Sequence, residues 1–373
     1  MGYQGRWCYV AYGLDSAKDI GVYNKIRAQQ KAINGLTGNC DLVVYGVDNI
    51  YTDIYGIKSY INYSENVYDD ILILNQYDYL YIRWGAYCKY FRQLLKDKKN
   101  EKYTIIVEIP TYPIKAELWG KGKSRFRDGR IIMGIKSVFG GILLQDIVFK
   151  SQLKYMDYLT MISYEKDVKG VKCIHIDNGI DICKFQQCSI KKKSSKVIMM
   201  IVANLTFSQA IDRVIEGIKQ YENKFNIEFR IVGDGDEKSR LIKLVNEYSL
   251  QEYVKFLGIK RDRELDILFD ECDVAIGSLG MSRDNIVGST LKTREYMARG
   301  IPFVASELET IGEEIEDYVC RIKDDENPVD IEKIIDYVQN VDRERIANIF
   351  RNEASKNASW DSQIKKVLQA INY

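Results

Sequence analysis

A short stretch at residues 288–300, GSTLKTREYMARG, holds the residues whose types and spacing best suit the binding of an anion. The apolar spacing predicts a helix that follows the small polar Gly-Ser-Thr and ends at Gly300, where a C-cap glycine is expected. A helix N-terminus attracts anions through its free backbone N–H groups and its dipole. Lys292 and Arg294 add positive charge to the first turns, and Glu295 adds a carboxylate. The stretch therefore predicts a site for a phosphorylated ligand.

A second turn that could approach a ligand is IVGDG at 231–235, which follows a predicted strand. Gly233 and Gly235 would let the backbone come close to a ligand at the carboxyl end of that strand. Asp234 and Asp236 imitate an Asp-x-Asp metal motif. Their place in a tight turn after a strand favours a turn role over metal binding.

The composition limits the classes of protein to which the chain can belong. The 373 residues are 46% apolar and 29% charged, which predicts two globular domains with ample core. A formal net charge of +1 gives no reason to expect a nucleic-acid partner. Eight cysteines without a CxxC pair and a single histidine argue against a zinc site and a disulfide scaffold, and they favour a reducing cytoplasm. We find neither a signal peptide nor an apolar run of about 18 residues, and we expect no required metal.

Predicted strands alternate with predicted helices along the whole chain, which indicates α/β architecture with parallel sheets. The basic segment 186–196 is the best linker candidate. We therefore predict an N-terminal domain over 1–182 and a second domain over 183–355. Two doubly wound halves would form a cleft where the carboxyl ends of their strands meet, and ligands usually bind in such a cleft.

At this point the chain resembles a known family, the retaining glycosyltransferases of group 1, also called family 4. The resemblance rests on these segments of the second half, in order and spacing: IVGDG, VKFLG (254–258), CDVAIGSLG (272–280) and LKTREYMARGIPFVAS (291–306). In the first half, VEIPTYP (107–113) and YIRW (81–84) resemble the branch that acts in capsule or exopolysaccharide synthesis. The resemblance implies the GT-B fold, in which two Rossmann-like domains face each other across a cleft. SWDSQ (359–363) is similar to the segment where the family's last helix crosses back, which implies that a C-terminal helix at about 356–373 joins the first domain.

The resemblance also implies an activity. A sugar would pass from a UDP- or GDP-sugar to a glycan or lipid-linked oligosaccharide, with retention at the anomeric carbon and without a metal. The first domain would bind the acceptor and the second the nucleotide sugar. Domain closure about a hinge near Asn178 and Gly179 would exclude water.

Residue roles follow from the same resemblance. Lys292 and Arg213 would neutralise the departing diphosphate, Glu295 would hold the ribose, and Glu108 would line the cleft. The other candidate donor-binding residues are Gly21, Asn204, Gly233, Asp234, Ser289, Thr290 and Leu291. From the sequence alone, Glu295 could instead form an i,i+4 ion pair with Arg299, and Lys292 could be a solvated lysine in the first turn.

The sequence departs from the family pattern at three places. The first of the two glutamates that the family shows falls at Val287, and its phosphate-binding arginine and lysine fall at Asn204 and Gln209. Arg283 or Arg294 could supply the charge instead. The third departure is a histidine of the first domain, in whose place Glu108, Thr111 or Tyr112 would line the cleft.

These departures leave two other functions open. One is a catalytically degenerate subunit that binds and stabilises an active glycosyltransferase. The other is a nucleotide-sugar epimerase, which would need acid and base groups for which this chain offers few candidates.

Three further features have both a functional and a structural reading. The basic segment 121–136 could contact an anionic membrane and a lipid-diphosphate acceptor, or it could be a solvated helix face. Arg83 and Glu108 end neighbouring apolar strands, where they could line a cleft or simply pair with each other. His175 lies inside a predicted strand, which favours a structural role.

Overall fold

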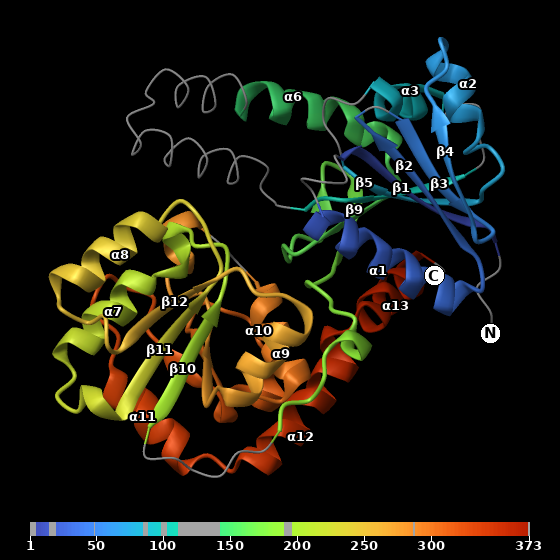
Figure 1. The fold of residues 1–373 in the computed structure, drawn as a ribbon. Coiled ribbons are helices and arrows are strands. Elements are labelled where there is room, and N and C mark those ends of the chain that lie inside the picture. The colour runs from blue at the N-terminus through green and yellow to red at the C-terminus, as the bar shows by residue number, and fades with distance from the viewer. Residues whose placement is uncertain are drawn as a thin grey trace. The chain divides into compact units, whose positions relative to one another are not determined.

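The computed structural model describes residues 5–14, 20–47, 49–84, 89–97, 103–110, 142–189, 196–285 and 288–371. The chain divides into two compact units (Figure 1). The first unit comprises Met1–Asp177 together with Trp360–Tyr373, and the second comprises Asn178–Ser359. The chain thus leaves the first unit after Asp177 and returns to it at Trp360.

The first unit is built on a nine-stranded sheet with the order β4-β3-β2-β1-β5-β6-β7-β9-β8. Its strands are β1 (Trp7–Leu14), β2 (Cys40–Gly46), β3 (Asn49–Ile54), β4 (Ile57–Asn62), β5 (Tyr79–Arg83), β6 (Thr104–Glu108), β7 (Tyr158–Met161), β8 (Asp167–Val168) and β9 (Val171–His175). The six strands from β2 to β9 in this order pair in parallel, while β3, β4 and β8 are antiparallel additions at the edges. Strand β1 is buried on both faces from Trp7 to Tyr12, as expected for a central strand of a parallel sheet.

Helices cover both faces of this sheet. They are α1 (Ile20–Thr37), α2 (Val67–Leu72), α3 (Lys89–Asp97), α6 (Ile142–Gln152) and α13 (Trp360–Ile371). Helices α1 and α13 pack together on one face, where Ile26, Ile33 and Leu368 share a core with Tyr9 of β1. On the other face Phe91 and Leu94 of α3 pack in a core with Val10 and Val107.

The second unit has a six-stranded, fully parallel sheet with the order β12-β11-β10-β13-β14-β15. Its strands are β10 (Val197–Val202), β11 (Ile227–Val232), β12 (Val254–Gly258), β13 (Val274–Ile276), β14 (Phe303–Ser306) and β15 (Cys320–Ile322). Its helices are α7 (Ile211–Gln220), α8 (Lys238–Glu247), α9 (Asp262–Glu271), α10 (Leu291–Arg299), α11 (Ile331–Asn340) and α12 (Arg343–Glu353). One core joins the sheet to α7, α8 and α11, and the other joins it to α9, α10 and α12.

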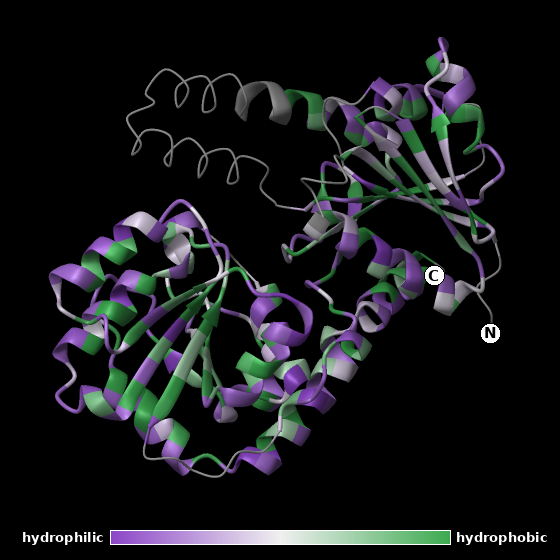
Figure 2. Ribbon diagram, in the orientation of Figure 1, coloured by the Kyte–Doolittle hydropathy of each residue, from purple (hydrophilic) through white to green (hydrophobic). Residues whose placement is uncertain are grey.

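Two α/β layered units, one with a mostly parallel sheet and one with a fully parallel sheet, confirm the fold class predicted from the alternating pattern. Hydrophobic residues run along β10 and neighbouring strands, whereas hydrophilic residues gather on the outer surfaces of the helices (Figure 2). In the part of the chain that the structure describes, no helix combines the length and the apolar character needed to cross a bilayer.

Candidate functional site

The second unit contains a pocket of about 430 Å³ beside the end of β10 and the start of α10. It is lined by Ile180, Phe185, Val202, Ala203, Asn204, Thr290, Leu291, Lys292 and Glu295. Five of the residues predicted from the sequence line this one pocket: Asn204, Thr290, Leu291, Lys292 and Glu295. Within the second unit, Arg213, Gly233, Asp234 and Ser289 do not line it.

Helix α10 presents its N-terminus to this pocket. Thr290 is the N-cap, and its hydroxyl accepts a hydrogen bond from the Thr293 N–H at 3.4 Å. The N–H groups of Leu291 and Lys292 precede the first intrahelical hydrogen bonds and have no acceptor within the helix. At the other end, Gly300 has φ 66° and closes the helix, which confirms the predicted C-cap. The pocket wall thus carries open backbone donors, as an anion site requires.

Lys292 is the one cation among the residues that line the described pocket. Its ammonium group donates to Gln209 Oε1 at 2.5 Å and to Ser278 Oγ at 2.6 Å. Burial lowers the pKa of Lys292 to about 8, although Glu309 acts in the opposite direction. The lysine is therefore not the solvated first-turn residue that the sequence also allowed.

Glu309 is a buried carboxylate beneath the start of α10, and we did not anticipate it from the sequence. It is 2% exposed, and its Oε1 accepts hydrogen bonds from the Thr290 N–H at 2.7 Å and from the Thr293 hydroxyl. Its Oε2 has no hydrogen-bond partner among the residues that the structure describes. The only available signal is its position shortly after β14, at the sheet edge where polar side chains gather.

Glu295 lines the pocket and also forms the ion pair that the sequence allowed. Arg299 donates through Nε to Glu295 Oε1 at 2.8 Å and is held in turn by Asp266 at 2.7 Å. The side chain of Glu295 is 19% exposed, so this pair is not a surface pair. Burial raises the pKa of Glu295, and Arg299 opposes that effect. Arg299 orients the carboxylate through one oxygen and leaves Oε2 as an acceptor for a ligand hydroxyl.

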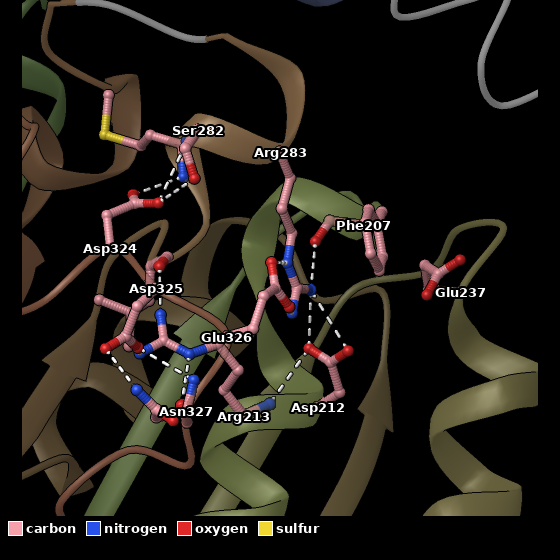
Figure 3. A network of polar contacts seen from close by, with 12 residues as sticks. Phe207, Asp212, Arg213, Glu237, Ser282, Arg283, Asp324, Asp325, Glu326 and Asn327 are labelled. Carbon is pink, nitrogen blue, oxygen red and sulfur yellow. Dashed lines mark hydrogen bonds and ion pairs between the residues drawn. The ribbon is translucent and has the colours of Figure 1, made fainter.

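Arg213 lies in a polar network away from the pocket wall (Figure 3). Its guanidinium is 2% exposed and donates to the carbonyl oxygens of Asn327, Leu279 and Lys323 at 2.7, 2.7 and 3.0 Å. It also donates to Asp325 Oδ1 at 2.7 Å. Three of these acceptors hold α7 against the segment 323–327 and the fourth belongs to Leu279; together they engage each nitrogen of the guanidinium. The contacts favour a structural role over the phosphate-binding role that we expected.

The two alternative cations are also engaged. Arg283 contacts Asp212 at 2.9 Å and Glu326 at 2.6 Å, and its guanidinium lies 4.1 Å from the centre of the Phe207 ring (Figure 3). Arg294 is 4% exposed and donates to Ser289 Oγ at 2.9 Å. The Ser289 hydroxyl therefore accepts a hydrogen bond from Arg294 inside the unit and does not line the pocket.

The two glycines of the turn after β11 serve the packing of two loops. Gly233 and Gly235 have φ of 130° and 156°, and a Cβ on either would collide with backbone atoms of Ala203 or Leu205. Asp234 between them is exposed and pairs with Lys238 at 3.0 Å. Glycine is needed here because one loop approaches another, whereas we had expected it to admit a ligand. Of this region, Asn204 is exposed and lines the pocket.

The remaining candidates lie in the first unit. Glu108 is 2% exposed at the end of β6 and contacts Lys25 at 2.9 Å, Arg83 at 3.4 Å and the Tyr9 hydroxyl at 3.1 Å. Burial alone would raise its pKa, but Lys25 and Arg83 outweigh burial and lower the pKa to about 2. A carboxylate this acidic stays ionised at neutral pH and is a weak general base. Gly21 lies in the first turn of α1, where a Cβ would meet no other atom within 4 Å among those of the described residues.

Several expectations fall outside the described residues, namely those on Val287, Thr111, Tyr112 and the segment 121–136. His175 ends β9, stacks on Tyr164 with ring centres 4.0 Å apart, and lies 3.6 Å from Asp177. Within the described ranges, we find no group of three or more His, Cys, Asp and Glu side chains placed to hold a metal ion. Metal independence stays a prediction.

Comparison with known proteins identifies the family of the second unit. Residues 184–359 match the family model of the group 1 glycosyl transferases. The chain is 29% identical over 140 residues to a putative colanic acid biosynthesis glycosyltransferase, WcaL, of Salmonella typhimurium, covering 37% of this chain and 34% of the relative. It is 29% identical over 217 residues to the O-antigen biosynthesis glycosyltransferase WclY of Escherichia coli, covering 55% and 57%. These matches span about a third to somewhat over half of the relatives' own length.

Solved structures with the same fold cover nearly the whole chain. Anabaena Alr3699/HepE in complex with UDP aligns with a TM-score of 0.64 at 11% identity, over 98% of this chain and 99% of that one. The apo lipopolysaccharide outer core galactosyltransferase WaaB aligns with a TM-score of 0.59 at 13% identity, over 98% and 99%. At such identities the likeness bears on the fold alone. Residues 184–359 therefore form a domain of the group 1 glycosyl transferases, and the chain as a whole has the two-unit GT-B fold of these solved structures.

Proposed function

We propose that this chain transfers a sugar from a nucleoside diphosphate sugar to a saccharide acceptor, with retention, in the assembly of a bacterial polysaccharide. The observation that carries the proposal is the pocket of the second unit, which combines the open N-terminus of α10, the Lys292 ammonium and the Glu295 carboxylate. The names of WcaL and WclY support the polysaccharide context. The UDP complex of HepE makes a uridine nucleotide the first donor to test.

The diphosphate would bind at the start of α10. The N–H groups of Leu291 and Lys292 offer two donors there, and the Lys292 ammonium offers a charge. In this structure that ammonium binds the neutral acceptors Gln209 and Ser278. A phosphate oxygen would compete well for it, because hydrogen bonds between two charged groups are roughly twice as strong as neutral ones. Asn204 is exposed at the same pocket and offers an amide to a phosphate or a sugar.

The nucleoside would occupy the rest of the pocket. Glu295 Oε2 would accept hydrogen bonds from the ribose hydroxyls, since Arg299 engages the other oxygen. Ile180, Phe185 and Val202 give the pocket an apolar wall on which a base could pack.

Catalysis would depend on stabilising the leaving group. The bond between the anomeric carbon and the diphosphate breaks, and negative charge grows on the diphosphate oxygen as it does so. Donors that are already in place around that oxygen stabilise the transition state more than the ground state. Lys292 and the first N–H groups of α10 are those donors in this proposal.

A thermal-shift panel with UDP, GDP, ADP, CDP and their common sugars tests the proposal directly. A ligand that binds only the native state raises its stability, so we expect one nucleotide to raise the melting temperature. Adding a chelator should leave the shift unchanged if no metal is required. No shift with any nucleotide at millimolar concentration would contradict the proposal and favour the catalytically degenerate subunit.

The pocket bears on the donor, so the acceptor and the cellular location are separate proposals. We propose a glycan or lipid-linked oligosaccharide acceptor, used in the cytoplasm and in peripheral contact with the inner face of the membrane. The membrane contact rests on the basic segment 121–136, which lies outside the described residues.

A further inference from the structure

A second cluster of polar side chains lies at the carboxyl edge of the sheet in the first unit. The chain runs from β1 to β2 on one side of β1, and β5 lies on the other side. The carboxyl ends of β1 and β5 therefore flank the point where the winding of the sheet reverses, and open α/β sheets bind ligands at such a point. Arg83 ends β5, Glu108 ends β6 in register with it, and Lys25 comes from α1 after β1.

Glu108 is fully engaged within this cluster. Its Oε1 lies 2.9 Å from the Lys25 ammonium, and its Oε2 lies 3.1 Å from the Tyr9 hydroxyl. The Tyr9 hydroxyl also lies 2.8 Å from the side-chain amide of Gln29, and both Tyr9 and Gln29 are fully buried. Each oxygen of the carboxylate thus already has a closer partner than Arg83.

Arg83 has a largely buried guanidinium that is poorly paired within the described part of the chain. The one ion contact found there is the 3.4 Å approach of Nη1 to Glu108 Oε2, and among the described residues buried Nη1 has no hydrogen-bond acceptor. The side chain is 17% exposed. A buried donor that loses its water without gaining an acceptor destabilises the protein. Arg213 in the second unit shows the contrast, because a structural arginine of this chain has an acceptor for every nitrogen.

We propose that Arg83 binds an oxyanion of the acceptor, either a phosphate or a sugar carboxylate. The fork of the guanidinium matches the two oxygens of either group. Glu108 is then a positioning residue that holds Lys25 and Arg83 at the strand ends, and Lys25 adds positive potential. The inference rests on the proposed function for its statement that the anion belongs to the acceptor.

Binding of three small probes to the full chain tests this inference. The probes are methyl phosphate, a methyl glucuronoside and the neutral methyl glucoside, each titrated by ligand-observed NMR in the presence of saturating UDP. We compare the wild type with Arg83→Gln and with a matched control, Arg92→Gln, which changes an exposed arginine on α3 of the same unit. A charged probe should bind the wild type and the control alike, and should bind Arg83→Gln roughly 10- to 100-fold more weakly.

The pattern of loss identifies the source of the anion. Loss for methyl phosphate alone supports a phosphate-bearing acceptor, and loss for the glucuronoside alone supports an acidic sugar. The inference is overturned if neither charged probe binds the wild type, if Arg83→Gln binds them as the wild type does, or if the neutral glucoside is affected equally.

Two further measurements distinguish a failure of this inference from two other outcomes. One outcome is a folding defect in the variant, and the other is a failure of the proposed donor site. Arg83→Lys keeps the charge without the fork, so it should retain the fold and bind the charged probes with intermediate affinity. UDP should bind the wild type and the Arg83 variants alike, because its pocket lies in the second unit. If UDP binds none of them while a charged probe still depends on Arg83, the proposed donor site is wrong and the anion site stands.

Discussion

The ammonium group of Lys292 is partly shielded from water where it contacts Gln209 and Ser278, and this environment makes its charge sensitive to pH. The folded-state pKa of about 8 lies below the ordinary value of 10.5. Below about pH 8 the ammonium is charged, and folding carries the penalty of burying that charge. As the pH rises from about 8 towards 10.5 the folded state loses its proton first, so this residue's contribution to stability improves with pH. Ligand binding should respond in the opposite direction.

We predict that affinity for the nucleoside diphosphate falls as the pH rises above about 8, because the neutral amine attracts phosphate much less. Lys292→Arg keeps its charge in this range, since arginine titrates above about pH 12. Its affinity should therefore be flat between pH 7 and 9. Isothermal titration calorimetry across this range measures both profiles, and identical profiles for the two proteins would count against a charged Lys292 at the phosphates.

Glu295 gives a second prediction at this scale. Glu295→Ala should weaken UDP binding by about tenfold, because one hydrogen bond from a charged group to the ribose contributes roughly 1.5 kcal/mol. A UDP analogue that lacks both ribose hydroxyls should bind the wild type and the variant equally. The two changes then form a double-mutant cycle. Additive losses would show that Glu295 does not contact the ribose.

The sequence could predict some of these residues and not others for a clear reason. Lys292 and Glu295 could be predicted on the pocket wall because helical periodicity places residues three apart on the same face of the helix. The partners of Arg213 and the contacts of Glu309 come from segments far along the chain, which local spacing does not reveal. The same limit applied to Gly233, where the atom that excludes a side chain belongs to Ala203.

At the scale of elements, the loops around the pocket are joined by buried arginines. Arg213 ties α7 to the segment 323–327, and Arg283 ties the turn at Met281–Asp284 to Asp212 and Phe207 (Figure 3). Gln209 and Ser278, which hold Lys292, follow β10 and β13 close to these turns. The network thus keeps the residues that position the Lys292 ammonium in place.

We predict that Arg213→Met destabilises the protein by about 3 kcal/mol, because it leaves buried carbonyl groups and a carboxylate without their donor. Arg263→Met is the matched control, since Arg263 is exposed on α9, and it should change stability by less than about 0.5 kcal/mol. Urea unfolding measures both. If Arg213→Met instead loses UDP affinity at unchanged stability, then Arg213 binds phosphate as we expected from the sequence.

The elements themselves were predictable to different degrees. The strands from β10 to β14 are short apolar runs between helices, which is why the alternating pattern of strands and helices could be predicted here. The hairpin of β3 and β4 was missed, because β4 is exposed along its length and lacks the alternation of a half-buried strand. Its signal was the two-residue turn at Tyr55 and Gly56, both of which have positive φ.

At the scale of the whole molecule, each unit has its own hydrophobic cores. The clusters of the first unit draw on α1, α3 and α13, and those of the second unit on α7 and α10. The alternating pattern predicted this division in outline, because one parallel sheet cannot accommodate so many strand–helix units in one core. The return of the chain to the first unit at Trp360 could be anticipated only from the family resemblance.

We predict two transitions in differential scanning calorimetry, because separate cores allow separate unfolding. UDP should raise the temperature of one transition, that of the second unit, and leave the other nearly unchanged. A single transition that UDP shifts as a whole would show that the two units unfold together.

The central claim is that the Lys292 ammonium supplies the charge for the donor diphosphate, and a lysine swap tests it most directly. Because that ammonium lies 2.5 Å from Gln209 Oε1, a lysine at position 209 can place its own ammonium close to the same point. Calorimetry would compare UDP binding to the wild type, Lys292→Gln, the double variant Gln209→Lys/Lys292→Gln, and Lys243→Gln as a control exposed on α8.

We expect Lys292→Gln to bind UDP about 10- to 100-fold more weakly, the double variant to recover most of that loss, and the control to match the wild type. Unchanged UDP affinity in Lys292→Gln would contradict the account.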